Sequence, residues 1–212
     1  MKKHIRLTAV LLSGLMMSAT VSSTALPFSA AADSTLVYDD ESGVTYNTQD
    51  DWLHVEGDKI VDMNGNEVWL TGCNWFGYNV GSQVFDGVWS QNMHEMLNQI
   101  ADHGFNLLRV PVSTELLLQW RDGGKDPATP KVNQYCNPEL TVEGVAGGTI
   151  LDSFTIWGKA VQWCRQNGIK IMIDIHSAET DSAGHQVNLW YTDRFSTQDW
   201  CDALYWLADY YK

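Results

Sequence analysis

The chain has 212 residues with a formal net charge of −13, and 44% of them are hydrophobic. This length and apolar content allow one domain with a sizeable core. The acidity disfavours nucleic acid as a partner, because a surface this negative repels phosphate backbones. The four cysteines match no zinc-binding spacing, and three disulfide pairings among them stay open.

The first 32 residues have the pattern of a secretory signal peptide. Basic residues come first, residues 7–17 are largely apolar, and a stretch of small residues ends at Ala32. We expect cleavage near Ala32 and a secreted, extracellular protein that does not associate with a membrane afterwards. The alternative is an uncleaved membrane anchor. Residues 33–51 are acidic and polar and predict a linker, which leaves residues 52–212 as the folded domain.

The domain is predicted to open with a small β-ribbon. Leu53–Glu56 and Lys59–Met63 alternate weakly between apolar and polar residues. Asn64 and Gly65 form a strong turn signal, after which Glu67–Gly72 is expected to return as a strand.

Helical and strand patterns then alternate along the chain. Ser90 is expected to cap a helix that ends before Gly104, and Leu107–Pro111 follows as a short apolar strand. An irregular stretch is expected up to about residue 148. A second helix, the strand 169–175 and a third helix follow. The second helix has an apolar stripe at Ile150, Phe154, Trp157, Val161 and Cys164. The third helix opens with a capping box at Ser196–Asp199, and its apolar face carries Trp200, Leu204, Leu207 and Tyr211.

Repeated strand and helix units predict an α/β fold with a parallel sheet. The helix-to-strand links are short and the strand-to-helix links are long, which favours a (β/α)8 TIM barrel with its site at the carboxyl ends of the strands. A doubly wound sheet would place its site at the same ends. No glycine-rich phosphate loop follows a strand, which disfavours nucleotide binding.

The strand 169–175 leads into titratable residues. Side chains alternate along a strand, so Met172, Asp174 and His176 share one face, and the three isoleucines between them share the other. We expect the first set to point into the barrel, with His176 at its rim, and the same reasoning places Arg109 at the rim of the preceding strand. A structural ion pair between Arg109 and Asp174, and a structural role for His176, are the alternatives.

Aromatic residues gather in the loops that follow the predicted strands. Aromatic planes stack on the C–H faces of sugar rings, so such loops suit a carbohydrate ligand. The alternative is that these side chains cover the barrel rim. The residues are Trp75, Phe76, Tyr78, Phe85 and Trp89 after the first strand, and Trp190, Tyr191 and Phe195 after the third.

A metal site formed by His176, Glu179 and His185 is a further alternative. The spacing of the three residues matches no specific ligand pattern, so we expect neither a metal nor a cofactor.

Five segments, in order and at the expected elements, carry a resemblance to a known family. The chain from Leu53 to Lys212 resembles the N-terminal part of a family 5 glycoside hydrolase of clan A, of the endoglucanase (cellulase) type. The segments are Leu70–Gly77, Gly87–Trp89, Gly104–Pro111, Asp174–His176 and Leu189–Tyr191.

The resemblance implies a secreted endo-β-1,4-glucanase that hydrolyses a polysaccharide with retention and is a monomer at full length. It implies that Arg109 steadies the nucleophile carboxylate, and that His176 lies in the subsite of the sugar being cleaved. The same resemblance makes Asn74, Trp75, Trp89, Trp190 and Tyr191 candidates for substrate binding.

Retaining glycosidases use two glutamates roughly 5 Å apart. The resemblance places them at the ends of strands 4 and 7, the first after an asparagine, and no such pair ends a strand here. Asn66-Glu67 lies in the ribbon, and Glu115 and Glu179 lie in loops. We therefore expect an incomplete catalytic domain, a β-hairpin plus about three βα units, that is inactive alone. A β-mannanase, a xyloglucanase or a non-catalytic glycan-binding protein are the alternatives.

Overall fold

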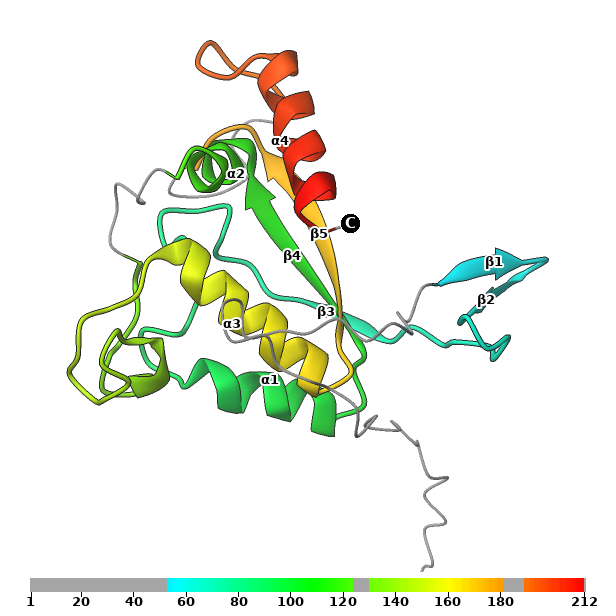
Figure 1. Cartoon of the computed structure of the whole chain (residues 1–212), viewed down its shortest axis with the longest axis horizontal. Coiled ribbons are helices and arrows are strands. Elements are labelled where there is room, and N and C mark those ends of the chain that lie inside the picture. The colour runs from blue at the N-terminus through cyan, green and yellow to red at the C-terminus, as the bar shows by residue number, and fades with distance from the viewer. Residues whose placement is uncertain (1–52, 124–129, 181–188, 212) are drawn as a thin grey trace, which may run out of the picture. The chain divides into compact units, whose positions relative to one another are not determined.

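The computed structural model describes residues 53–123, 130–180 and 189–211. The predicted signal peptide and the linker at 33–51 lie outside the described residues. The elements, in chain order, are β1 (His54–Glu56), β2 (Lys59–Val61), β3 (Gly72–Asn74), α1 (Met93–Asp102), β4 (Leu107–Ser113), α2 (Thr114–Arg121), the 3-10 helix η1 (Pro138–Leu140), α3 (Ser153–Gln166), β5 (Lys170–Ser177) and α4 (Thr197–Tyr210) (Figure 1).

The predicted parallel sheet is confirmed by β3, β4 and β5, which lie side by side in chain order. Arg109 of β4 is in register with Asn74 of β3 and with Met172 of β5. Each crossover carries a helix, and the carboxyl ends of the strands meet at one edge, as in barrel folds. The sheet therefore places the loops that follow β3, β4 and β5 at a common edge.

Among the described residues, helices cover one face of this sheet and leave the other open. Leu108, Val110 and Val112 of β4 are fully buried, and the isoleucines of β5 pack against the same core. In Figure 1, α1 and α3 lie together on this side, and α3 contacts β5. Met172, on the opposite face, is 49% exposed. The predicted division of β5 into a core face and a second face is thus confirmed.

The start of α1 differs from the prediction. Its N-cap is Asn92, two residues after Ser90, and the Asn92 side chain accepts a hydrogen bond from the backbone N–H of Glu95. The Asn92 side-chain amide also donates to the carbonyl of Cys136, at 2.8 Å, so a distant loop fixes this cap.

Helix α2 falls in the stretch that was predicted to be irregular. It follows β4 with no loop between them, because Ser113, the last strand residue, is itself the N-cap. Leu116, Leu117 and Leu118 are all buried, so the helix lacks the polar face that would have marked it in the sequence.

The other differences concern element ends. The predicted strand 67–72 is wrong: Glu67 forms an isolated bridge with Val61, and β3 begins at Gly72. The apolar stripe predicted for the second helix included Ile150, but α3 starts at Ser153, so Ile150 lies outside the helix. The predicted capping box of α4 is present, although Leu204 is exposed and Ala203 is buried in its place.

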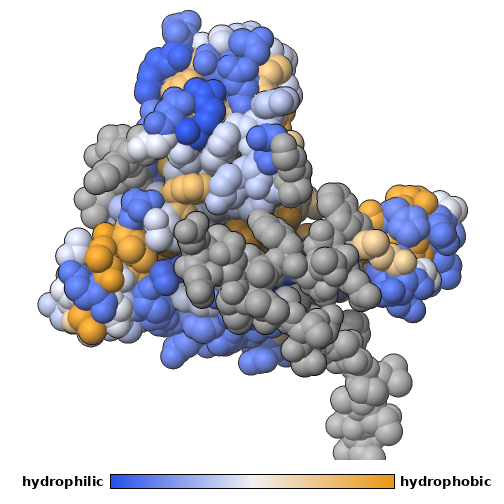
Figure 2. All heavy atoms as spheres, viewed as in Figure 1, coloured by the Kyte–Doolittle hydropathy of each residue, from blue (hydrophilic) through white to orange (hydrophobic). Residues whose placement is uncertain are grey.

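The β1–β2 ribbon is an antiparallel pair whose surface is mixed. Figure 2 shows apolar and hydrophilic atoms next to each other over this ribbon. The exposed apolar side chains there are Val55 and Ile60, which are paired across the two strands. Among the helices in the described part of the chain, none has the length and apolar character needed to cross a membrane.

Candidate active site

Arg109, Asp174 and His176 form a connected polar group on the open face of the sheet. The Arg109 guanidinium donates to the Asp174 carboxylate through Nη2, and the same nitrogen lies 3.3 Å from His176 Nδ1. His176 Nδ1 lies 3.0 Å from Asp174 Oδ2. One carboxylate oxygen thus holds both the guanidinium and the imidazole. The sequence predicted the shared face, and the structure brings the three side chains together.

The position of Arg109 corrects one expectation. Strand β4 continues four residues beyond it to Ser113, so Arg109 lies within the strand and not at its rim. Its long side chain reaches along the face to Asp174, which is in register with Pro111. The ion pair between Arg109 and Asp174, considered as an alternative, is present. An ion pair does not exclude a role toward substrate, because the three side chains keep 30–36% of their surface exposed.

His176 occupies an irregular position in β5. Val112 is in register with Ile175, but the next residue, Ser113, is in register with Ser177, so the ladder skips His176. Bulges of this kind bend a strand and change the direction of a side chain, and they are frequent beside active sites. The skipped residue is the one that the sequence singled out, although no sequence signal indicated the irregularity.

Trp190 and Tyr191 form an exposed aromatic pair in the segment that precedes α4. Their rings are 5.4 Å apart and nearly perpendicular, and the side chains are 48% and 43% exposed. The indole N–H of Trp190 donates to Thr197 Oγ1 at 3.0 Å, which fixes the ring at the start of α4. Exposed, oriented rings of this kind present a face on which a sugar could stack.

The aromatic residues after β3 divide into two groups. Trp75 stacks on the buried ring of Phe85, with 4.2 Å between centroids, and its N–H donates to the carbonyl of Asp86. One face of Trp75 is therefore already covered. Trp89 is 56% exposed, and Asn74 is exposed at the carboxyl end of β3. Their roles in substrate binding stay predictions.

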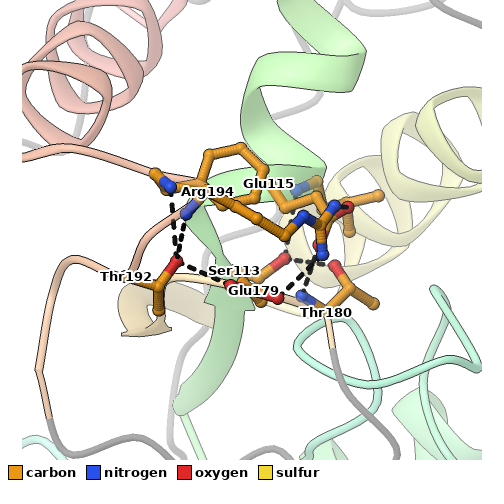
Figure 3. Close-up of polar contacts among 8 residues, drawn as sticks. Ser113, Glu115, Glu179, Thr180, Thr192 and Arg194 are labelled. Carbon is orange, nitrogen blue, oxygen red and sulfur yellow. Dashed lines mark hydrogen bonds and ion pairs between the residues drawn. The ribbon is translucent and has the colours of Figure 1, made fainter.

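A second polar cluster lies at the carboxyl ends of β4 and β5 (Figure 3). The guanidinium of Arg194 donates to Glu115 Oε1 and to Glu179 Oε2, each at 2.7 Å. Glu115 Oε2 accepts from the backbone N–H of Thr180, and Glu179 Oε1 accepts from the hydroxyl of Thr192. All four carboxylate oxygens therefore have partners, and the two carboxylates raise the pKa of Arg194.

This cluster was not found from the sequence. Glu115 and Glu179 were placed in loops and Glu179 was considered as a metal ligand, but Arg194 was given no role. Arg194 is 79 positions from Glu115, and no local pattern connects two residues so far apart. The only available signal was the acidic first turn of α2, which contains Glu115.

The described residues contain no group of side chains that could bind a metal ion. Across 53–123, 130–180 and 189–211, no three His, Cys, Asp or Glu side chains are grouped so that they could hold an ion. His185, the third member of the trio considered above, lies outside the described residues. All four cysteines are described, and none of them forms a disulfide with another.

Comparison with known proteins gives the same family throughout. The model of the Cellulase family, glycosyl hydrolase family 5, matches residues 61–212. Endoglucanase G of Acetivibrio thermocellus is 43% identical over 177 residues, which are 78% of this chain and 31% of that protein. Endoglucanase B of the same organism is 38% identical over 163 residues, which are 77% of this chain and 27% of that protein. The chain thus spans less than a third of the length of these relatives.

Solved structures give the same result for the fold. A cellotetraose complex of the endocellulase from Pyrococcus horikoshii has a TM-score of 0.60 at 30% identity, and covers 74% of this chain and 38% of that one. The catalytic domain of the major endoglucanase from Xanthomonas campestris has a TM-score of 0.60 at 25% identity, and covers 74% and 40%. The predicted fold is confirmed: β3, β4 and β5 with their helices are consecutive units of a (β/α)8 barrel. Because the family model matches well over half of its length, this chain belongs to glycosyl hydrolase family 5.

Proposed function

We propose that this chain is part of a secreted endo-β-1,4-glucanase that hydrolyses its substrate with retention of configuration. The observation that carries the proposal is the group of Arg109, Asp174 and His176 on the open face of the parallel sheet. The exposed pair of Trp190 and Tyr191 in the loop after β5 supports a sugar ligand. The relatives named above are endoglucanases and endocellulases, which supports β-1,4-glucan as the substrate class.

Each side chain has a proposed role. The positive charge of Arg109 would keep a neighbouring nucleophile carboxylate ionised, because an opposite charge within a few ångströms favours the charged form of an acid. His176 would hydrogen-bond the sugar unit being cleaved. Asn74, Trp75, Trp89, Trp190 and Tyr191 would bind neighbouring sugar units.

The two catalytic glutamates would come from strands other than β3, β4 and β5. Glu115 and Glu179 lie just after β4 and β5, at the carboxyl ends of the strands, but Arg194 binds both of them. Each oxygen of both carboxylates already accepts a hydrogen bond within the cluster, so neither carboxylate offers an oxygen to a substrate. We therefore assign the acid/base and the nucleophile to residues outside this chain, and propose that residues 33–212 alone have no glucanase activity.

The test has two parts. The intact mass of the native secreted protein, with the reading frame sequenced past codon 212, would establish whether a fourth strand ending in Asn-Glu follows. Turnover of soluble β-1,4-glucan, compared with mannan and xyloglucan, would then define the substrate. Hydrolysis of mannan or xyloglucan in preference to glucan would overturn the substrate class. Glucanase activity from a purified protein of residues 33–212 would overturn the assignment of the glutamates.

A further inference from the structure

The side chain of Arg194 connects three separate segments at the edge of the sheet. Its Nη2 donates to Glu115 at the start of α2, and its Nη1 donates to Glu179 directly after β5. Arg194 itself belongs to the segment 189–195, which leads into α4. Figure 3 shows the guanidinium lying between the two carboxylates. A planar, forked cation suits this arrangement, because each of its two outer nitrogens points at a different acceptor.

The segment 189–195 is closed on itself by Thr192. The Thr192 hydroxyl donates to Glu179, and its oxygen accepts from the backbone N–H groups of Arg194 and Phe195, each at 3.2 Å. The backbone N–H of Thr192 donates to the carbonyl of Phe195 at 2.7 Å. This turn begins immediately after Trp190 and Tyr191. The contacts that hold this turn therefore also determine the position of the backbone that carries Trp190 and Tyr191.

The two carboxylates of this cluster are stabilised by the positive charge of Arg194. Glu115 and Glu179 are two negative charges on one cation, and their side chains keep only 14% and 25% of their surface exposed. Without the cation, the two carboxylates would face each other with reduced access to water, which is unfavourable for both. We expect the segment 189–195 to move away from the edge of the sheet, because the two ion pairs that hold it there are lost.

We propose that Arg194 is a positioning residue that holds Trp190 and Tyr191 as a sugar-stacking surface in the loop after β5. Arg194 acts through the turn at Thr192 and does not itself contact the sugar. This inference rests on the proposed function for its ligand, a β-1,4-linked glucan chain. The positioning of the segment by Arg194 rests on the contacts alone.

The first experiment measures the segment directly in the full chain. Amide hydrogen exchange, followed by mass spectrometry, is compared between the unmodified protein and Arg194→Gln. We expect faster exchange in peptides that contain residues 190–195, and unchanged exchange in β4 and α3. Arg194→Lys keeps the charge but not the fork, and should give an intermediate rate. Lys59→Gln, which removes another exposed ion pair at 2.7 Å, is the matched control and should leave the segment unchanged.

The second experiment measures binding of cellotetraose by the native protein, through the fluorescence of its tryptophans. Arg194→Gln should weaken binding by about tenfold, which corresponds to about 1.4 kcal/mol. In a Trp190→Ala background the same change should have little further effect, because both substitutions remove one interaction. Additive effects of the two substitutions would overturn the proposal, as would unchanged affinity in Arg194→Gln.

The two experiments distinguish the two proposals. If the unmodified native protein does not bind cellotetraose, the proposed substrate class fails, and the sugar-stacking role fails with it. If exchange in residues 190–195 is the same in Arg194→Gln and in the unmodified protein, the positioning role fails whatever the ligand is.

Discussion

His176 Nδ1 lies 3.0 Å from Asp174 Oδ2, and this oxygen also accepts the hydrogen bond from Arg109. The carboxylate thus holds a cation and an imidazole at once, on a face of the sheet that none of the described helices covers. Asp174 contributes to the candidate site by orienting its neighbours, which agrees with the structural ion pair considered for Arg109 and Asp174 from the sequence.

Replacing Asp174 by Asn tests this relationship. The substitution keeps the shape of the side chain but removes the charge that Arg109 contacts. We expect the free energy of unfolding to fall by about 1 kcal/mol, the upper part of the range for partly exposed ion pairs. Urea titration of both proteins measures the change. Asp58→Asn, at an exposed position in the β1–β2 turn, is the control and should have no effect. Equal stability of Asp174→Asn and the unmodified protein would contradict the prediction.

Gly77 is a glycine at which the surrounding backbone leaves no room for a side chain. A Cβ there would lie 2.0 Å from the carbonyl oxygen of Val84, and its φ of +136° is rarely adopted by other residues. Gly77→Ala should therefore lower the free energy of unfolding by at least about 3 kcal/mol, because the loop that carries Trp75 must shift. Thermal unfolding checks this. Gly81→Ala is the matched control, since a Cβ at Gly81 meets nothing within 4 Å. Similar melting temperatures for the two variants would exclude the predicted clash.

The parts of the fold that were predictable from the sequence are those that local chemistry determines. The capping box at Ser196 and Asp199 lies within four residues, and the alternation of β5 is read from consecutive side chains. The N-cap of α1 was placed two residues too early, because Ser90 and Asn92 are both good N-cap residues, and the contact that holds Asn92 to Cys136 spans 44 positions. Helix α2 was missed because its apolar run has no alternating polar face.

The candidate site also combines features that local sequence patterns predict with features that depend on the fold. The shared face of Asp174 and His176 follows from strand periodicity, and the structure confirms it. The reach of Arg109 to them depends on the register of β4 and β5, which the sequence does not specify. The contacts of Arg194 depend on how three separate segments meet, so only the folded structure reveals them.

Asn137 is a buried side chain that joins two loops after different strands. Its Nδ2 donates to the carbonyls of Val88 and Gln91, each at 2.9 Å, and its Oδ1 accepts from the backbone N–H of Met93 at 2.7 Å. Asn137→Ala leaves these buried groups without that partner, so we expect a loss of about 2–3 kcal/mol in the free energy of unfolding. Because Trp89 lies between the contacted residues, its fluorescence should also change.

Urea titration and the tryptophan emission spectrum measure the two effects. Asn64→Ala, in the exposed turn after β2, is the control and should change neither quantity. A loss below about 0.5 kcal/mol, the level typical of surface substitutions, would show that other groups replace the contacts of Asn137.

The buried thiol of Cys164 should make the free energy of unfolding of the protein depend on pH. Burial, reinforced by the neighbouring thiol of Cys73, raises the pKa of Cys164 from 9.0 to about 12. The unfolded chain therefore loses this proton at a lower pH than the folded protein does. The contribution of Cys164 to stability is complete below about pH 9 and is lost as the pH rises toward 12.

The measurement compares urea titrations at about pH 8 and about pH 10 for the unmodified protein and Cys164→Ala. The unmodified protein should lose up to about 1.4 kcal/mol more than the variant between the two values, because only its thiol titrates in the unfolded state. Other groups titrate in both proteins and cancel in the difference. Labelling with iodoacetamide gives a second readout: the exposed Cys201 should react in the folded protein, and Cys164 should not. Equal losses for both proteins, or labelling of Cys164 without unfolding, would mean that this thiol is accessible to water.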